Sequence, residues 1–212
     1  MATDDLAALL DSAARGVFPR PDGSLRVLPP APDGPEAVLA FSGAHVVVTT
    51  ASESEVRRRM PPGDLGAPLS ADVLGWFAQR SQRHCDNVDA VLAALPVEGG
   101  SDVELTPVAP DYPHPRVARS RRHRQDVRVF RDRGGRAVVV LGRGLGGRWE
   151  VSFEIDRGYR GTGLGSALAH AARAVVPDSA PLFAQVAPGN ASSLRAVLSA
   201  GYRPIGAEAL FY

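Results

Sequence analysis

Between Arg160 and Ser166 the sequence RGTGLGS combines one arginine with three glycines. Glycine has no Cβ, so the backbone reaches positive φ angles easily and a ligand oxygen can approach the amide groups closely. Helix-forming residues follow, and the first amides of a helix have no internal partner and carry about half a positive charge. The segment therefore predicts a phosphate site, to which Arg160 adds a cation. A glycine turn that only joins two elements remains the alternative.

The elements on either side of this loop are predicted to be a strand and a helix. Residues 149–155 alternate apolar and polar side chains, which is typical of a strand with one face in a core. Residues 166–176 are helix formers with one apolar stripe. Residues 181–187 predict a further strand, residues 190–200 a helix, and residues 203–212 contain a last strand. Upstream, residues 126–131 and 136–141 predict a hairpin.

The first half of the chain is predicted to alternate small helices and strands. The expected helices cover residues 4–14, 52–60, 70–80 and 87–95, and the expected strands cover residues 24–28, 36–41 and 45–50. Residues 98–101, which contain a glycine pair, predict a linker. We expect a small N-terminal α+β lobe over residues 1–98, which shapes an acceptor site or mediates an interaction, and a second domain over residues 101–212.

Two motifs in the second domain resemble those of the GCN5-related N-acetyltransferase (GNAT) superfamily. Arg160-x-x-Gly163-x-Gly165 at a strand-to-helix junction is similar to its pyrophosphate loop, and the helix from Asn190 to Gly201-Tyr202 is similar to its second cofactor motif. The resemblance implies an α+β fold with a mixed, mostly antiparallel sheet flanked by helices. It also implies that strands 149–155 and 181–187 splay apart around an acyl-CoA.

The resemblance further implies an acyl-CoA-dependent N-acyltransferase that transfers an acetyl group from acetyl-CoA, or another acyl group, to a primary amine without a metal. A non-catalytic acyl-CoA sensor or interaction module is the alternative. The residues that the resemblance assigns to cofactor binding are Phe153, Ile155, Arg160, Gly161, Thr162, Gly163, Leu164, Gly165, Ser166, Asn190 and Ser193.

Such a reaction needs a base for the amine, and Glu150 and Glu154 on the central strand are the candidates. They share the face opposite the apolar stripe, and burial would raise the pKa of either toward neutrality. Glu154 is preferred because it lies closest to the implied thioester position, although both could be solvated outward-facing carboxylates. The tyrosine that often serves as the acid in the family is replaced by Val197, and Tyr202 is expected in the core. The thiolate could leave as an anion, since a thiol has a pKa of about 8.5.

Two other patterns have competing interpretations. Residues 142–147 form a GxGxxG, but a strand follows where a dinucleotide fingerprint needs a helix, so a hairpin loop is expected. Residues 114–124 predict a helix with five arginines. It could present a cationic face to CoA phosphates or an acidic acceptor, or be a solvated helix surface.

Composition limits the class of protein. The chain has 212 residues, 44% of them hydrophobic, and a net charge of +1, so no global field favours nucleic acid or an anionic membrane. The single Cys85 excludes an internal disulfide, the N-terminus does not read as a secretory signal, and no apolar run is long enough to span a bilayer. We expect a cytoplasmic monomer or homodimer acting on a small-molecule or peptide amine.

Overall fold

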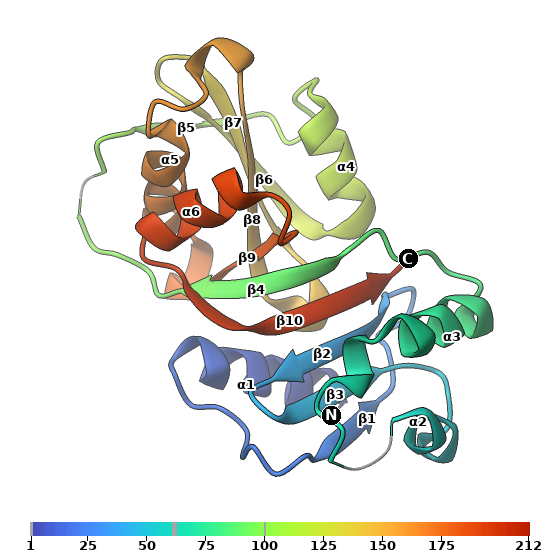
Figure 1. Cartoon of the computed structure of the whole chain (residues 1–212). Coiled ribbons are helices and arrows are strands. Elements are labelled where there is room, and N and C mark those ends of the chain that lie inside the picture. Colours follow the sequence, from blue (N-terminus) through green and yellow to red (C-terminus); the bar gives the residue numbers. More distant parts are fainter. Residues whose placement is uncertain (1, 61–62, 100) are drawn as a thin grey trace. The chain divides into compact units, whose positions relative to one another are not determined.

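Figure 1 shows a computed structural model of the protein, which describes residues 2–60, 63–99 and 101–212. The chain forms two compact units, Met1–Val91 with Pro204–Tyr212, and Leu92–Arg203. This grouping differs from the predicted division at residues 98–101, because the last strand of the chain pairs with a strand of the first half. Gly100 of the predicted linker lies outside the described residues.

The first unit contains a mixed sheet with helices. Its elements are α1 (Ala2–Ala14), β1 (Leu25–Leu28), β2 (Glu36–Phe41), β3 (Ala44–Val48), α2 (Glu53–Arg59), the 3-10 turn η1 (Ala67–Leu69), α3 (Ala71–Ser81), the start of β4 (Val88–Ala94) and β10 (Arg203–Phe211). The strand order is β1-β3-β2-β10-β4. Val56 of α2 and Phe77 of α3 share one core with Val38, Val47 and Phe211.

The sequence predicts a helix over residues 87–95, and this prediction is wrong. Alanine and leucine favour a helix locally, but the chain forms strand β4, in which the side chains of residues 91–94 are all buried. β4 lies between β10 and β9 in the strand order. An interior strand covered on both faces has no polar face to reveal its period, so tertiary packing overrides local propensity here.

His45 on β3 makes the first unit sensitive to acid. Its side chain is buried, and neither ring nitrogen has a hydrogen-bond partner among the described residues. Arg57 and Asp64 line the same small pocket. Burial lowers the pKa of His45, so below the ordinary value of about 6.5 the unfolded chain takes up a proton that the folded chain resists.

We therefore expect the free energy of unfolding to be highest above about pH 6.5 and to fall as the pH drops toward the folded pKa, by at most about 1.4 kcal/mol per pH unit from this group. Urea denaturation between pH 8 and pH 5 measures the slope. His45→Leu should reduce this slope, because leucine cannot take up a proton. Equal slopes in the wild type and His45→Leu would contradict the assignment.

The second unit contains the remaining sheet and three helices. Its elements are β5 (Leu105–Val108), α4 (Pro115–His123), β6 (Gln125–Asp132), β7 (Ala137–Arg143), η2 (Leu145–Gly147), β8 (Trp149–Ile155), η3 (Arg157–Tyr159), α5 (Leu164–Ala174), η4 (Pro177–Ser179), β9 (Leu182–Val186) and α6 (Ala191–Ser199). From the end of β4 the order is β4-β9-β8-β7-β6-β5. The pairs from β5 to β8 are antiparallel, and β8 pairs with β9 in parallel. The predicted fold class, a mixed and mostly antiparallel α+β sheet flanked by helices, is confirmed.

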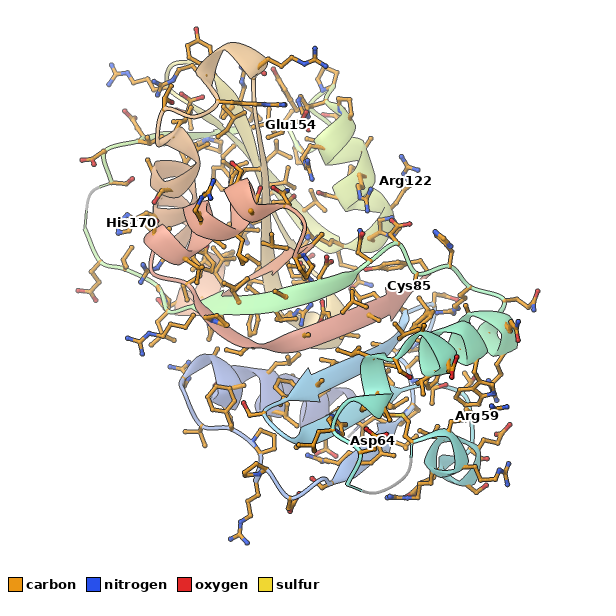
Figure 2. The ribbon with its side chains drawn as sticks, viewed as in Figure 1. Arg59, Asp64, Cys85, Arg122, Glu154 and His170 are labelled. Carbon is orange, nitrogen blue, oxygen red and sulfur yellow. The ribbon has the colours of Figure 1, made fainter. Side chains whose placement is uncertain are left out.

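The two faces of this sheet carry different helices. Val117 of α4 packs on Val129, Val138 and Val140 on one face, and α5 packs on the face that carries Phe153 and Ile155. Figure 2 shows Arg122 of α4 and His170 of α5 on opposite sides of the sheet. Because side chains alternate along a strand, the polar residues of β8 face α4 and its apolar residues face α5.

Within the described residues no helix has the length and hydropathy needed to cross a bilayer. Nor does the described part of the chain contain a group of three or more His, Cys, Asp or Glu side chains that could hold a metal ion.

Candidate functional site

Strands β8 and β9 are paired only at their N-terminal ends. The register joins Trp149 to Leu182 and Glu150 to Phe183, whereas β8 continues to Ile155 and β9 to Val186. Over the described lengths beyond these pairs the two strands have no register. This agrees with the separation of the two strands that the motif resemblance implies. Beyond Glu150, β8 still pairs with β7 on one edge, and its other edge has no register with β9.

The glycine loop follows β8 and leads into α5. Gly161 and Gly163 have φ angles of 77° and 84°, in the left-handed region where a side chain costs roughly 1–2 kcal/mol. Gly163 is the N-cap of α5, and no side chain caps the helix. A Cβ at either glycine would meet no atom within 4 Å. The positive end of α5 is therefore open beside a glycine backbone, which suits an anion.

Arg160 fastens the loop to the end of β8. Its Nε donates to the carbonyl oxygen of Ile155 at 3.0 Å, and the Thr162 hydroxyl donates to the carbonyl oxygen of Tyr159 at 2.8 Å. This bond holds the loop against β8, where β8 has already left β9. The role of Arg160 as a cation for the ligand stays a prediction.

Gly165 is required for close packing, unlike Gly161 and Gly163, which lie in open space. A Cβ there would lie 3.3 Å from the Ala196 Cβ, 3.5 Å from the Ile155 Cδ1 and 3.6 Å from the Phe153 Cε2. The missing side chain thus lets α5 approach α6 and β8 closely. Leu164, also assigned to cofactor binding, has its side chain buried in the core, so only the backbone of residues 164 and 165 can serve a ligand.

Asn190 caps α6. Its Oδ1 accepts a hydrogen bond from the Ser193 backbone N–H at 3.1 Å, the usual structural use of an asparagine at this position. The Asn190 side chain is exposed and Ser193 is half-buried. Their assignment to cofactor binding stays a prediction.

A stripe of α4 lies along the polar face of β8. Arg116 pairs with Glu154 at 3.4 Å, and the Ser120 and Ser152 hydroxyls are 3.4 Å apart. We call these four residues together with Arg124 and Glu150 the α4–β8 stripe. At its other end the Arg124 Nε donates to Glu150 Oε2 at 2.7 Å. Arg116 and Ser120, four apart on α4, thus face Glu154 and Ser152, two apart on β8, and Arg124, which directly follows α4, reaches Glu150.

Glu150 is buried inside this stripe. Besides Arg124 it accepts from the Arg148 Nε at 2.9 Å and from the Gln185 amide. Burial alone would raise the pKa of Glu150, but the attraction of Arg148 and Arg124 outweighs burial and lowers the pKa below its usual range. An ionised carboxylate held by two guanidinium groups is a poor proton acceptor, so Glu150 is unsuited to the role of base.

Glu154 differs from Glu150 in access. Its side chain is 38% exposed, and within the described part of the chain it forms a long ion pair with Arg116, which is 35% exposed. Glu154 lies in the part of β8 that has separated from β9, on the face opposite Phe153 and Ile155. Of the two carboxylates proposed from the sequence, Glu154 is the exposed one, which an incoming amine could reach.

The tyrosines of the second unit do not supply an obvious acid. Tyr202 is buried, its hydroxyl donates to the Ala169 carbonyl oxygen at 3.2 Å, and burial raises its pKa far above the usual range. Val197 is buried in the core. Tyr159 is 46% exposed in the loop after β8.

The α4–β8 stripe was not predicted from the sequence, although the spacing of its residues is visible there. Arg116, Ser120 and Arg124 follow one another at intervals of four residues, which places them on one helix face. Glu150, Ser152 and Glu154 alternate on one strand face. The first set is positively charged and the second is negatively charged. This complementarity predicts that the helix packs against the strand.

The chain was compared with known proteins. No family model and no curated protein matches it. Among solved structures it is similar to a GCN5-related N-acetyltransferase from Kribbella flavida, with a TM-score of 0.42 and 16% identity over 64% of this chain and 62% of that one. It is also similar to an acetyltransferase from the GNAT family from Colwellia psychrerythraea, with a TM-score of 0.40 and 10% identity over 79% of this chain and 75% of that one.

These likenesses are partial. The chain matches less than two thirds of the length of the Kribbella protein, and both TM-scores lie below 0.5. Both neighbours carry the name of the superfamily whose motifs the sequence resembles. We rest the functional proposal on the residues of the site.

Proposed function

We propose that this protein is an acyl-CoA-dependent N-acyltransferase of the GNAT type, which transfers an acetyl group from acetyl-CoA to a primary amine. The observation that carries the proposal is the junction of β8 with α5. An uncapped helix N-terminus with open glycines is fastened by Arg160 to the end of a strand that has left its neighbour. The N-terminus of α5 would bind an anion, and the adjacent edge of β8 that has left β9 would pair with an extended ligand.

The two features match the two chemical parts of the cosubstrate. Amides within residues 161–166 would hold the diphosphate, because the helix dipole favours negative charge there. The Ser166 N–H already donates to the Gly163 carbonyl oxygen at 3.1 Å, so the donors would come from residues 161–165. The edge of β8 that faces away from β7 would hydrogen-bond the amide-containing arm as an added strand does, and a backbone N–H of residues 153–155 on this edge would hold the thioester oxygen, since the Ile155 carbonyl oxygen already accepts from Arg160. Asn190 and Ser193 at the start of α6 would complete the site.

Glu154 would serve as the base. The acceptor ammonium gives one proton to the Glu154 carboxylate and becomes a nucleophilic amine. Its lone pair forms the C–N bond at the thioester carbon, the second nitrogen proton is released, and the C–S bond breaks with its electron pair leaving on sulfur. A thiolate is a stable leaving group because a thiol has a pKa of about 8.5, so the reaction does not depend on a tyrosine at position 197.

Release of CoA thiol in the presence of a panel of amines tests the proposal. Sustained release that requires both acetyl-CoA and an amine, with the acetylated amine identified by mass spectrometry, is the expected result. A thermal shift with acetyl-CoA and no turnover with any amine would favour a non-catalytic acyl-CoA sensor, which the Glu154–Arg116 pair and the valine at position 197 would also suit. Absence of both signals would refute the acyl-CoA proposal.

A further inference from the structure

We infer that the acceptor is an amine that also carries a carboxylate close to its nitrogen, as a free α-amino acid does. The inference rests on the proposed function and concerns the second substrate of the same site. It is drawn from the Arg116–Glu154 pair and from the charges around it.

In the free protein Arg116 and Glu154 satisfy each other. Their side chains are 3.4 Å apart and about one third exposed, so both are accessible to a solute. The Arg116 Nε is shielded from solvent and has no hydrogen-bond partner among the residues that the structure describes. The pair therefore presents one carboxylate and one guanidinium on the polar face of β8.

An amine that binds to Glu154 takes the place of Arg116. A simple alkylamine would leave the guanidinium without its partner, and an unpaired, partly desolvated charge is costly. An amine with an adjacent carboxylate replaces both partners at once, since its ammonium meets Glu154 and its carboxylate meets Arg116. A guanidinium is also well shaped for a carboxylate, which it can bind through two parallel N–H bonds.

The surrounding charges disfavour polycationic acceptors. The sequence of α4, PRVARSRRH, contains arginines and no acidic residue. Arg124 also approaches β8, at Glu150, and that carboxylate is already held by Arg124 and Arg148. Because like charges repel strongly at short range in a partly buried site, a polyamine would be rejected where an amino acid is accepted.

The test compares kcat/KM for α-amino acids with kcat/KM for their carboxamides, in the wild type and in variants of Arg116. For the wild type we expect kcat/KM for α-amino acids to exceed that for their carboxamide counterparts by about 10- to 100-fold, the size of one charge-assisted hydrogen-bonded contact. Arg116→Gln should remove this preference from both sides: KM for the amino acid should rise because its carboxylate loses the guanidinium, and kcat/KM for the carboxamide should rise because no guanidinium is left without a partner, so the two values converge. Arg116→Lys should restore part of the preference because it restores the charge.

Arg122→Gln is the control, because Arg122 is an exposed arginine of the same helix. It should leave the preference and the rates unchanged. Equal kcat/KM for amino acids and carboxamides in the wild type would overturn the inference, and so would an equal loss for both acceptors in Arg116→Gln. Acylation of simple amines with no such preference would leave the proposed function standing, whereas acylation of no amine at all would refute that function itself.

Discussion

Glu154→Gln is expected to lower kcat for amine acylation by about 10²- to 10⁴-fold, the usual contribution of a general base. The amide has nearly the shape of the carboxylate but cannot take the ammonium proton. The affinity for acetyl-CoA should stay unchanged, because the diphosphate site at residues 161–166 does not include this side chain. Steady-state thiol release and calorimetric titration of acetyl-CoA measure the two quantities separately.

Glu150→Gln distinguishes a base from a structural carboxylate. Glu150 lies between Arg124 and Arg148 and is 3% exposed, and removal of one member of a buried ion pair typically costs about 3–5 kcal/mol. This variant should therefore lose stability in urea denaturation, whereas Glu154→Gln should not. If Glu154→Gln kept full turnover, Glu154 would not be the base.

Gly163→Val is expected to weaken acetyl-CoA binding by at least about tenfold. The residue has a φ of 84°, which costs roughly 1–2 kcal/mol for a residue with a side chain. The new side chain would also enter the open space beside the N-terminus of α5, where the diphosphate is proposed to lie. Calorimetric titration with acetyl-CoA gives the dissociation constants.

Gly158→Val is the matched control for this change. A Cβ at Gly158 also meets no atom within 4 Å, and its φ is not in the left-handed region. It precedes the proposed anion site on the same loop, in η3. We expect near wild-type affinity in Gly158→Val. An unchanged dissociation constant in Gly163→Val would contradict the placement of the diphosphate.

Elements with a local signal were predictable from the sequence. The hairpin of β2 and β3 turns at Gly43, which has a φ of 93°, and the Ser52–Glu55 capping box at the start of α2 is formed. The GxGxxG of residues 142–147 leads into strand β8 rather than a helix, as expected. In each case the residues that fix the structure lie within a few positions of one another.

Features that depend on distant pairing were not predictable. The Ala and Leu content of β4 favours a helix, and only its neighbours in the sheet make it a strand. The antiparallel pairing of β10 with β2 joins residues about as far apart as the chain allows, for example Phe211 with Glu36. The linker predicted at residues 98–101 suggested that the two halves of the chain fold separately, so this pairing between them was not expected.

In the candidate site, too, locally specified features were predictable and features that depend on distant contacts were not. The open glycines and the uncapped helix lie where the sequence places them, because one local motif specifies the loop. Periodicity showed that Glu150 and Glu154 share a strand face, but it could not show that Glu150 is held by two arginines and Glu154 by one at longer range. Arg124, at the C-terminal end of α4, is separated from β8 by two strands in the chain, whereas Arg148 directly precedes β8.

The most direct test of the account is an amide titration by heteronuclear NMR on the ¹⁵N-labelled protein with coenzyme A. If residues 161–166 bind the diphosphate, coenzyme A should cause large, saturable chemical-shift changes in their backbone N–H resonances. Acetyl-pantetheine, which lacks the diphosphate, should leave the chemical shifts of most of these resonances unchanged. Saturable binding of coenzyme A with those resonances unmoved, or no binding at millimolar concentration, would contradict the account.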